Sequence, residues 1–255
     1  MHKFACLYFF LYFFPLLAIA DDNLNIAVAA NFRPTLLKIV DSYHRENTTT
    51  IIKLSSASTG VLYAQIKHGA PFDLFLSADS ATAELLANEL TVPPPFTYAV
   101  GNLVFWCPAG APNTVDEFAQ WRGQYALANP KLAPYGAAAA EVVSNANWPE
   151  ANRVITVNNV AQVSQLVSTG HVDCGFIAKS LVPVNTAMNE LFPIPPQWHT
   201  ALVQKAVILP TGLNKPALHH FLTYVAQQAA PLLMDSGYNL PAPDTIYEAP
   251  KDDSS

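Results

Sequence analysis

Charged residues are scarce in this chain. Asp, Glu, Lys and Arg together make up 13% of its 255 residues, against roughly a quarter in an average soluble protein. So low a charge is also typical of membrane proteins, and the distribution of the apolar residues decides between the two classes. Only the N-terminus carries a long continuous apolar block, and no later run approaches the length of a membrane-spanning helix. We therefore expect the rest of the chain to be soluble.

Positive charge is the scarcer sign. The chain has 13 Lys and Arg against 19 Asp and Glu, which gives a net charge of -6. Lys3 is the only charged residue among the first 20, so the chain after Ala20 carries -7. Such an acidic protein is a poor candidate for binding nucleic acid or an anionic membrane surface. It also has no basic surface with which to collect an anionic ligand.

The local signatures of several enzyme classes are missing as well. The sequence contains no G-x-S-x-G, P-loop, H-E-x-x-H or S-x-x-K motif. A secreted enzyme stays an alternative, because catalytic triads need not be local in sequence. His219 and His220 are adjacent, and adjacent side chains on a helix point apart, so they do not predict a metal site. No cofactor is predicted.

Cysteine is rare too, with Cys6, Cys107 and Cys174 as the three examples. Cys6 lies in the N-terminal apolar block. The other two either form a disulfide in an oxidising compartment or are buried separately as small apolar residues. The sequence leaves both alternatives open.

The N-terminal block has the layout of a secretory signal. Lys3 provides a basic start, residues 4–17 are apolar and aromatic, and Ala18-Ile19-Ala20 places small residues before Asp21. This pattern predicts a signal peptide over residues 1–20, cleaved after Ala20, and export to the periplasm. The alternative, a membrane anchor, needs a longer apolar run.

Short apolar runs alternate with amphipathic stretches, which predicts an α/β fold. We expect strands at 25–30, 50–54, 73–77, 125–128, 154–157 and 173–178. We expect helices at 35–45, 59–68, 80–88, 135–146, 160–168 and 216–228.

Two longer apolar runs, at 96–106 and 201–209, are expected to cross between two lobes. Lobe 1 is then discontinuous, with residues 21–101 and 207–240, and lobe 2 comprises residues 102–206. The Pro-rich and then acidic segment 241–255 is expected to be disordered. A ligand would lie in the cleft between the lobes, beyond strand ends.

Three strand-to-helix junctions share one chemical character. They combine small residues, hydroxyls or an amide with the unpaired N–H groups of a helix start, which suit an anion. The junctions are 28–34, 55–60 and 133–137. Taken singly, their Ser, Thr and Asn residues are ordinary helix caps. Arg33 beside the first junction keeps open a clamp for an organic carboxylate.

Four segments make the chain resemble the molybdate-binding periplasmic proteins of ABC transporters. They are A-V-A-A-N-F at 27–32, S-T-G-V-L-Y-A-Q-I at 58–66, G-A-P-F-D-L-F-L-S-A-D at 69–79 and N-P-K-L-A-P-Y-G-A-A at 129–138. The resemblance implies a two-lobed type II periplasmic-binding fold with a molybdate or tungstate ligand. It also implies a membrane permease as the partner of a monomeric binding protein. Sulfate, phosphate or a small organic anion in the same fold is the alternative ligand.

The resemblance carries ligand roles to particular positions of this chain. Asn31 matches a Ser or Asn ligand, and Ala30 matches the backbone contact before it. Ser58 matches a ligand hydroxyl, with Thr59 as the alternative because the register is uncertain by one residue.

The second half of the chain supplies the remaining expected ligands. The resemblance implies that Tyr135 and Val160 bind the anion through their backbone N–H groups. One departure stands out, because some family members place a ligand tyrosine where this chain has Ala178. Either Tyr135 or another group is expected to replace that hydroxyl.

Overall fold

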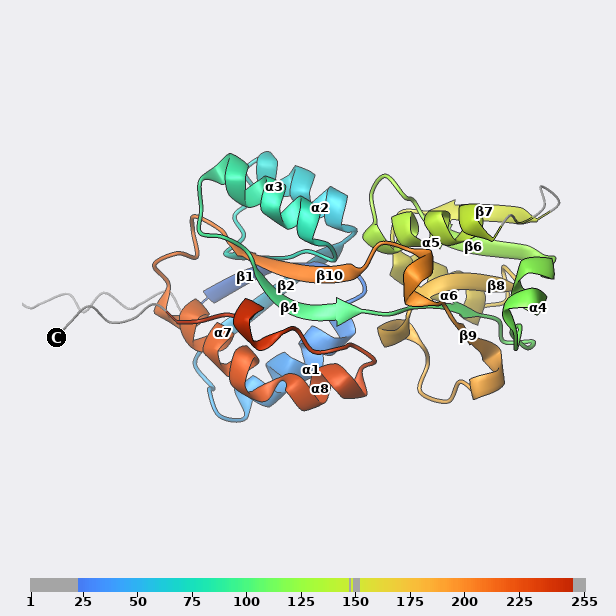
Figure 1. Ribbon diagram of the computed structural model, residues 1–255. Helices are drawn as coiled ribbons and strands as arrows, with labels where there is room; N and C mark the ends of the chain where they lie inside the picture. Colours follow the sequence, from blue (N-terminus) through green and yellow to red (C-terminus); the bar gives the residue numbers. More distant parts are fainter. Residues whose placement is uncertain (1–22, 147, 149–151, 250–255) are drawn as a thin grey trace, which may run out of the picture.

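The computed structural model describes residues 23–146, 148 and 152–249. Two five-stranded sheets form two α/β lobes that lie side by side (Figure 1). The predicted signal peptide, residues 1–20, lies outside the described residues. No helix in the described ranges has both the length and the apolar character that crossing a bilayer requires.

The first sheet has the strand order β2-β1-β3-β10-β4. Its strands are β1 (Asn23–Ala29), β2 (Ile51–Ala57), β3 (Leu74–Leu76), β4 (Phe96–Gly101) and β10 (Leu202–Ile208). β1 runs parallel to β2 and β3, whereas β10 runs antiparallel to β3 and β4. The expected strands at 25–30, 50–54 and 73–77 are thus confirmed in type.

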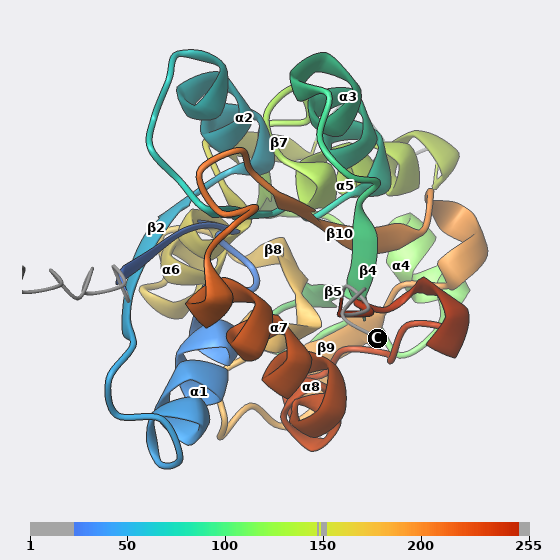
Figure 2. The same cartoon turned by 90° about the vertical axis from the view of Figure 1, so that its left-hand side faces the viewer.

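Helices cover both faces of this sheet, as Figures 1 and 2 show. They are α1 (Arg33–His44), α2 (Thr59–Lys67), α3 (Ser80–Leu90), α7 (Pro216–Gln228) and α8 (Ala230–Asp235). Side chains of β1 alternate between the faces. Ile26 and Val28 pack in the cluster that includes residues of α1, α7 and α8, and Ala27 packs in the cluster with α2 and α3. This two-sided burial explains why β1 reads as an apolar run.

The second sheet has the order β7-β6-β8-β5-β9. Its strands are β5 (Leu103–Trp106), β6 (Gln124–Ala128), β7 (Arg153–Val157), β8 (Cys174–Ala178) and β9 (Leu191–Pro193). The helices of this lobe are α4 (Val115–Gln120), α5 (Pro134–Asn145) and α6 (Val160–Ser168). β6 runs parallel to β7 and β8, and β5 runs antiparallel to β8 and β9.

The chain changes sheets within the first long apolar run and outside the second. Residues 96–106 divide into β4 in the first sheet and β5 in the second, with Asn102 between them. β10 lies wholly in the first sheet, so the expected crossing within 201–209 is wrong. The expected lobe boundary between residues 206 and 207 falls inside β10, and the return to the first lobe precedes Leu202. A strand buried on both faces is apolar throughout, so the pattern does not separate it from a crossing segment.

The two cysteines beyond the N-terminal block are paired. Cys107 directly follows β5 and Cys174 begins β8, and a disulfide joins them across the antiparallel pairing of these strands. Both residues are also buried. The structure therefore selects the disulfide from the two alternatives that the sequence left open.

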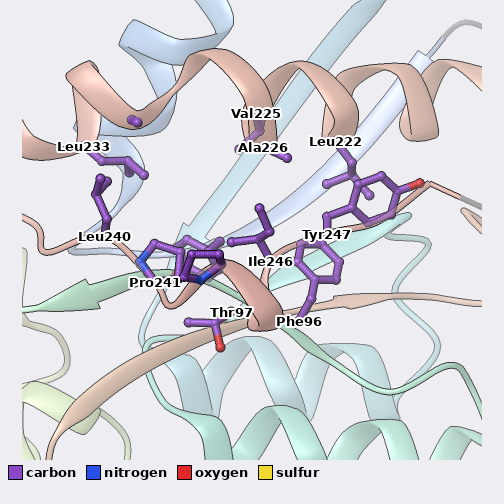
Figure 3. A pocket seen from close by; sticks show the side chains of 13 residues that line it. Phe96, Thr97, Leu222, Val225, Ala226, Leu233, Leu240, Pro241, Ile246 and Tyr247 are labelled. Atoms are coloured by element: carbon purple, nitrogen blue, oxygen red, sulfur yellow. The ribbon is translucent and has the colours of Figure 1, made fainter.

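The C-terminal segment differs from the disorder expected over 241–255. Residues 241–249 lie across the first lobe and include a short 3-10 turn at Pro243–Thr245. The Tyr247 side chain is buried, packs on Phe96 and shares a hydrogen bond of 2.7 Å with His219 Nδ1. Figure 3 shows Ile246 and Tyr247 with Phe96 and Leu222 around an apolar pocket. These apolar contacts outweigh the composition that indicated disorder; residues 250–255 lie outside the described residues.

Candidate functional site

Residues from both lobes line one small cavity between the sheets. Ala30 and Asn31 come from the β1–α1 junction and Ser58 and Thr59 from the β2–α2 junction, all in the first lobe. The starts of α5 and α6 in the second lobe complete the lining. The lining residues are Ala29, Ala30, Asn31, Ser58, Thr59, Ala78, Ala133, Pro134, Tyr135, Asn159 and Val160. All six residues singled out from the sequence are thus brought together.

The cavity is small and carries no charged side chain in its lining. About 10 Å³ of the cavity is open to the centre of a water-sized sphere, which is about the volume that a single bound water needs. Arg33 lines a neighbouring cleft with Asn159 and Gln162 and is exposed. It is therefore not a clamp within the cavity, and the organic-carboxylate alternative loses its main support.

Several backbone N–H groups at this cavity have no protein acceptor among the described residues. Four of them belong to Asn31, Thr59, Tyr135 and Val160. Thr59, Tyr135 and Val160 lie in the first turns of α2, α5 and α6, where N–H groups have no partner within the helix. The positive ends of three helix dipoles therefore meet at one place, with two of the four donors in each lobe.

Local sequence explains why these helix starts stay open. Ala133, the N-cap of α5, has no polar side chain, and Ser58, the N-cap of α2, makes no capping bond. Asn159 does cap α6, but its side chain accepts from Ala161 and Gln162 and leaves the Val160 N–H uncapped. By contrast, Asp79 caps α3 away from the cavity with a bond of 2.8 Å to the Thr82 N–H.

The Ser58 hydroxyl is the most informative group of the site. Its side chain is buried, with 4% exposure, and its Oγ has no hydrogen-bond partner among the described residues. Leaving a buried hydroxyl unsatisfied costs about 1–3 kcal/mol, so a site must compensate for it. Because Ser58 lines the cavity, an acceptor placed there would satisfy it together with the four N–H groups.

The neighbouring Thr59 side chain has a different task. Its Oγ1 accepts from the Ala78 N–H at 3.1 Å, which ties the start of α2 to the end of β3. Ser58 therefore supplies the available hydroxyl of this junction, and Thr59 offers its backbone N–H.

At the β1–α1 junction the structure corrects one expectation. The Ala30 N–H donates to the Ala57 carbonyl at 2.9 Å, so it is not an available donor. β1 and β2 are parallel neighbours, and this bond extends their ladder by one residue beyond β1. The available N–H is that of Asn31, one residue later.

The Asn31 side chain does not serve as an available donor in this arrangement. Its Nδ2 donates to Gln204 Oε1 at 2.9 Å and to the Tyr238 hydroxyl at 3.0 Å. Asn31 is 1% exposed. The backbone of Asn31 thus faces the cavity, while its amide holds a buried polar cluster.

At the position where some family members have a ligand tyrosine, this chain has no hydroxyl. Ala178 ends β8, is fully buried and pairs with Leu103. Two residues later, the Ser180 hydroxyl donates to the Asn31 carbonyl at 3.0 Å. The Tyr135 hydroxyl accepts from Gln204 Nε2 at 3.2 Å. Neither hydroxyl lies free at the cavity as a replacement.

Three polar residues that lie behind the cavity were not predicted from the sequence, namely Gln204, Tyr98 and Tyr238. Gln204 is fully buried in the middle of β10. The available signal was a polar amide inside the apolar run 201–209. Burial raises the pKa of Tyr98 and of Tyr135 well above the usual phenol value, so both hydroxyls stay protonated.

Comparisons with known proteins identify a family and several similar proteins. A family model described as bacterial extracellular solute-binding protein matches residues 24–239. The molybdate-binding protein ModA of Azotobacter vinelandii is 34% identical over 230 residues, which cover 86% of this chain and 90% of that protein. ModA of Rhodobacter capsulatus is 32% identical over 232 residues, covering 86% and 89%. The solved periplasmic molybdate-binding protein of Azotobacter vinelandii superposes with a TM-score of 0.77 at 30% identity, covering 86% of this chain and all of that one.

Proposed function

Because this chain belongs to the family of bacterial extracellular solute-binding proteins, we propose that its cavity captures molybdate or tungstate and delivers it to the permease of an ABC transporter. The relatives named molybdate-binding protein support this ligand. The observation that carries the proposal is the buried, unpartnered Ser58 hydroxyl among four backbone N–H groups from both lobes.

The chemistry of these groups matches a fully deprotonated tetrahedral oxyanion. Such an ion only accepts hydrogen bonds, and the available groups of Asn31, Ser58, Thr59, Tyr135 and Val160 can all donate. Hydrogen bonds to a charged group contribute roughly 1.5–3 kcal/mol each. Five of them support firm binding without a cation, which accords with the low content of basic residues.

The small cavity and its lining also favour this ligand over the alternatives. A bulky organic anion needs more space than the cavity offers. A phosphate that keeps a proton needs an acceptor, and no carboxylate lines the cavity. Sulfate presents the same acceptors as molybdate, so cavity size must separate these two ions.

The proposal includes a place of action and a cycle. The protein works in the periplasm as a monomer after cleavage of residues 1–20, and it binds its ligand without catalysing a reaction. One lobe comprises residues 23–101 with 202–249, and the other comprises residues 102–201. They close on the anion by bending near Asn102 and before Leu202, and donors from both lobes complete the shell.

Calorimetric titration and thermal shift with molybdate, tungstate, sulfate and phosphate test this function. A ligand at 100 times its dissociation constant adds about 2.7 kcal/mol to the stability. Ser58→Ala should weaken molybdate binding roughly 10- to 100-fold, because it removes one bond to the anion. It should not lower the stability of the unliganded protein, since the hydroxyl has no protein partner.

Ser236→Ala is the matched control. Its buried hydroxyl also lacks a partner among the described residues, but Ser236 does not line the cavity. We expect unchanged affinity. Equal affinity of wild type and Ser58→Ala, or a response to phosphate alone, contradicts the proposed function.

A further inference from the structure

A buried polar cluster joins the two lobes behind the cavity. It consists of Asn31, Tyr98, Tyr135, Gln204 and Tyr238, and we call it the interlobe cluster. All five side chains are at most 6% exposed. Asn31 and Tyr135 also present their backbone N–H groups at the cavity. The cluster therefore links the two walls of the cavity through their side chains.

Gln204 lies at the centre of the interlobe cluster and uses both ends of its amide. Its Oε1 accepts from Asn31 Nδ2 and from the Tyr98 hydroxyl, each at 2.9 Å. Both partners belong to the first lobe, like Gln204 itself. Its Nε2 donates across the lobes to the Tyr135 hydroxyl at 3.2 Å. One side-chain amide thus forms a hydrogen bond to Tyr135 in the second lobe while it also binds Asn31 in the first lobe.

The approach of Tyr135 to Gln204 depends on Gly101. Gly101 ends β4 at the point where the chain crosses between the lobes. A Cβ there would collide with the Tyr135 hydroxyl and come within 2.7 Å of Gln204 Nε2. Only glycine leaves room for the bond, so the backbone at the crossing is shaped to admit it.

We propose that the Tyr135–Gln204 hydrogen bond is a closure latch that positions the anion-binding N–H groups of both lobes. This proposal rests on the proposed function. When the lobes separate, the Tyr135 hydroxyl and Gln204 Nε2 each bind water, so their mutual bond stabilises the closed form alone. A bond made only in the closed form raises ligand affinity, because the ligand binds that form better.

Within one lobe the same kind of bond has a different effect. The Tyr98 hydroxyl lies 2.9 Å from Gln204 Oε1 and 3.0 Å from the Ser77 carbonyl, all in the first lobe. These bonds persist whether the lobes are open or closed. They stabilise the fold and contribute equally to the free and bound protein.

Tyr135→Phe and Tyr98→Phe form a matched pair that separates the two effects. Each removes one buried hydroxyl that contacts Gln204 and keeps the ring and the backbone. Tyr135→Phe should raise the dissociation constant for molybdate about 5-fold, as expected for one hydrogen bond. Its unfolding temperature without ligand should equal that of the wild type, and its dissociation should be faster. Tyr98→Phe should lower that temperature and change affinity less.

A double-mutant cycle with Gln204→Met gives an independent readout. Methionine keeps much of the volume and removes the amide, so Tyr135→Phe should cause no further loss of affinity in that background. Additive losses contradict the latch. So does a Tyr135→Phe variant that binds molybdate like the wild type, or one that loses only unliganded stability. Failure of the wild type to bind molybdate or tungstate overturns the proposed function, whereas those results on Tyr135→Phe overturn the latch alone.

Discussion

The two lobes share one topology but are stabilised differently. β1, β2, β3, β10 and β4 of the first sheet occupy the places that β6, β7, β8, β5 and β9 occupy in the second. In each, a central strand has parallel neighbours on both sides, followed by two antiparallel pairings. The architecture therefore places helix starts at matching strand ends, and this is how both lobes bring N–H donors to the cavity.

The interactions that stabilise the interior of each lobe differ. The second lobe contains a disulfide and a cluster of aromatic rings, in which Phe105 contacts Phe118, Trp121 and Trp148. The first lobe instead uses helices on both faces, the C-terminal segment and a partly buried ion pair between Asp73 and Lys215. The same backbone arrangement thus tolerates a covalent link in one copy and an electrostatic one in the other.

Removing the disulfide should affect this comparison most strongly. Cys107 and Cys174 are 67 residues apart, and closing a loop of that length contributes about 4 kcal/mol by chain entropy. Cys107→Ala with Cys174→Ala should lower the free energy of unfolding of the second lobe by about that amount. All four tryptophans belong to this lobe, so their fluorescence in a urea titration reports it selectively.

The wild-type protein with a reducing agent provides the control, since it loses the same link without a substitution. A fluorescence transition that does not move in either case contradicts the assignment of the link to the stability of the second lobe.

The next largest effect is expected at an aspartate that both lobes place before the third strand of their sheet. Asp73 accepts from the Asn25 N–H at 2.8 Å, and Asp173 accepts from the Gln124 N–H at 2.7 Å, at equivalent places before β3 and β8. Asp73 is buried and paired with Lys215 at 3.1 Å, whereas Asp173 is exposed. Asp73→Ala should cost about 3 kcal/mol, because it removes the buried carboxylate that accepts from the partly buried Asn25 N–H and pairs with Lys215.

Asp173→Ala should cost less than about 1 kcal/mol, because water can replace an exposed carboxylate. Urea unfolding followed by circular dichroism measures both variants, and tryptophan fluorescence shows whether the second lobe responds. Equal losses for the two variants show that burial and the lysine do not distinguish the lobes.

The strands and helices of both lobes were predictable because the spacing of apolar residues within each segment follows from which of its faces is buried. β1, β6 and α5 were expected near their observed positions, since apolar runs and helix starts are local features. Which sheet a strand joins is not local. β10 was divided between the lobes for this reason, and Tyr247 was assigned to disorder because its partner Phe96 is about 150 residues away in sequence.

The same distinction applies to the site. Asn31, Ser58, Tyr135 and Val160 lie at helix starts, where local chemistry and family resemblance both point to an anion. That the Ala30 N–H is already bonded to Ala57 depends on the β1–β2 ladder, which the sequence does not specify. Gln204 is 173 residues from Asn31, so only the folded chain shows that the two amides meet.

The smallest expected effect concerns pH, where the difference between the lobes disappears. No Asp, Glu, His, Lys or Arg lines the cavity, and both lobes supply neutral donors. Burial raises the pKa of Tyr98 and of Tyr135, so the phenols beside the cavity remain protonated. Molybdate affinity measured by calorimetry should therefore stay constant from about pH 6 to about pH 9, a range in which a histidine or an amino-terminal clamp would titrate. Above about pH 10 the unfolded chain releases phenol protons that the folded one retains, so stability falls as pH rises. A change of molybdate affinity near the pKa of histidine would show that a charged group reaches the anion. It would contradict the expectation that both lobes bind the anion through neutral donors alone.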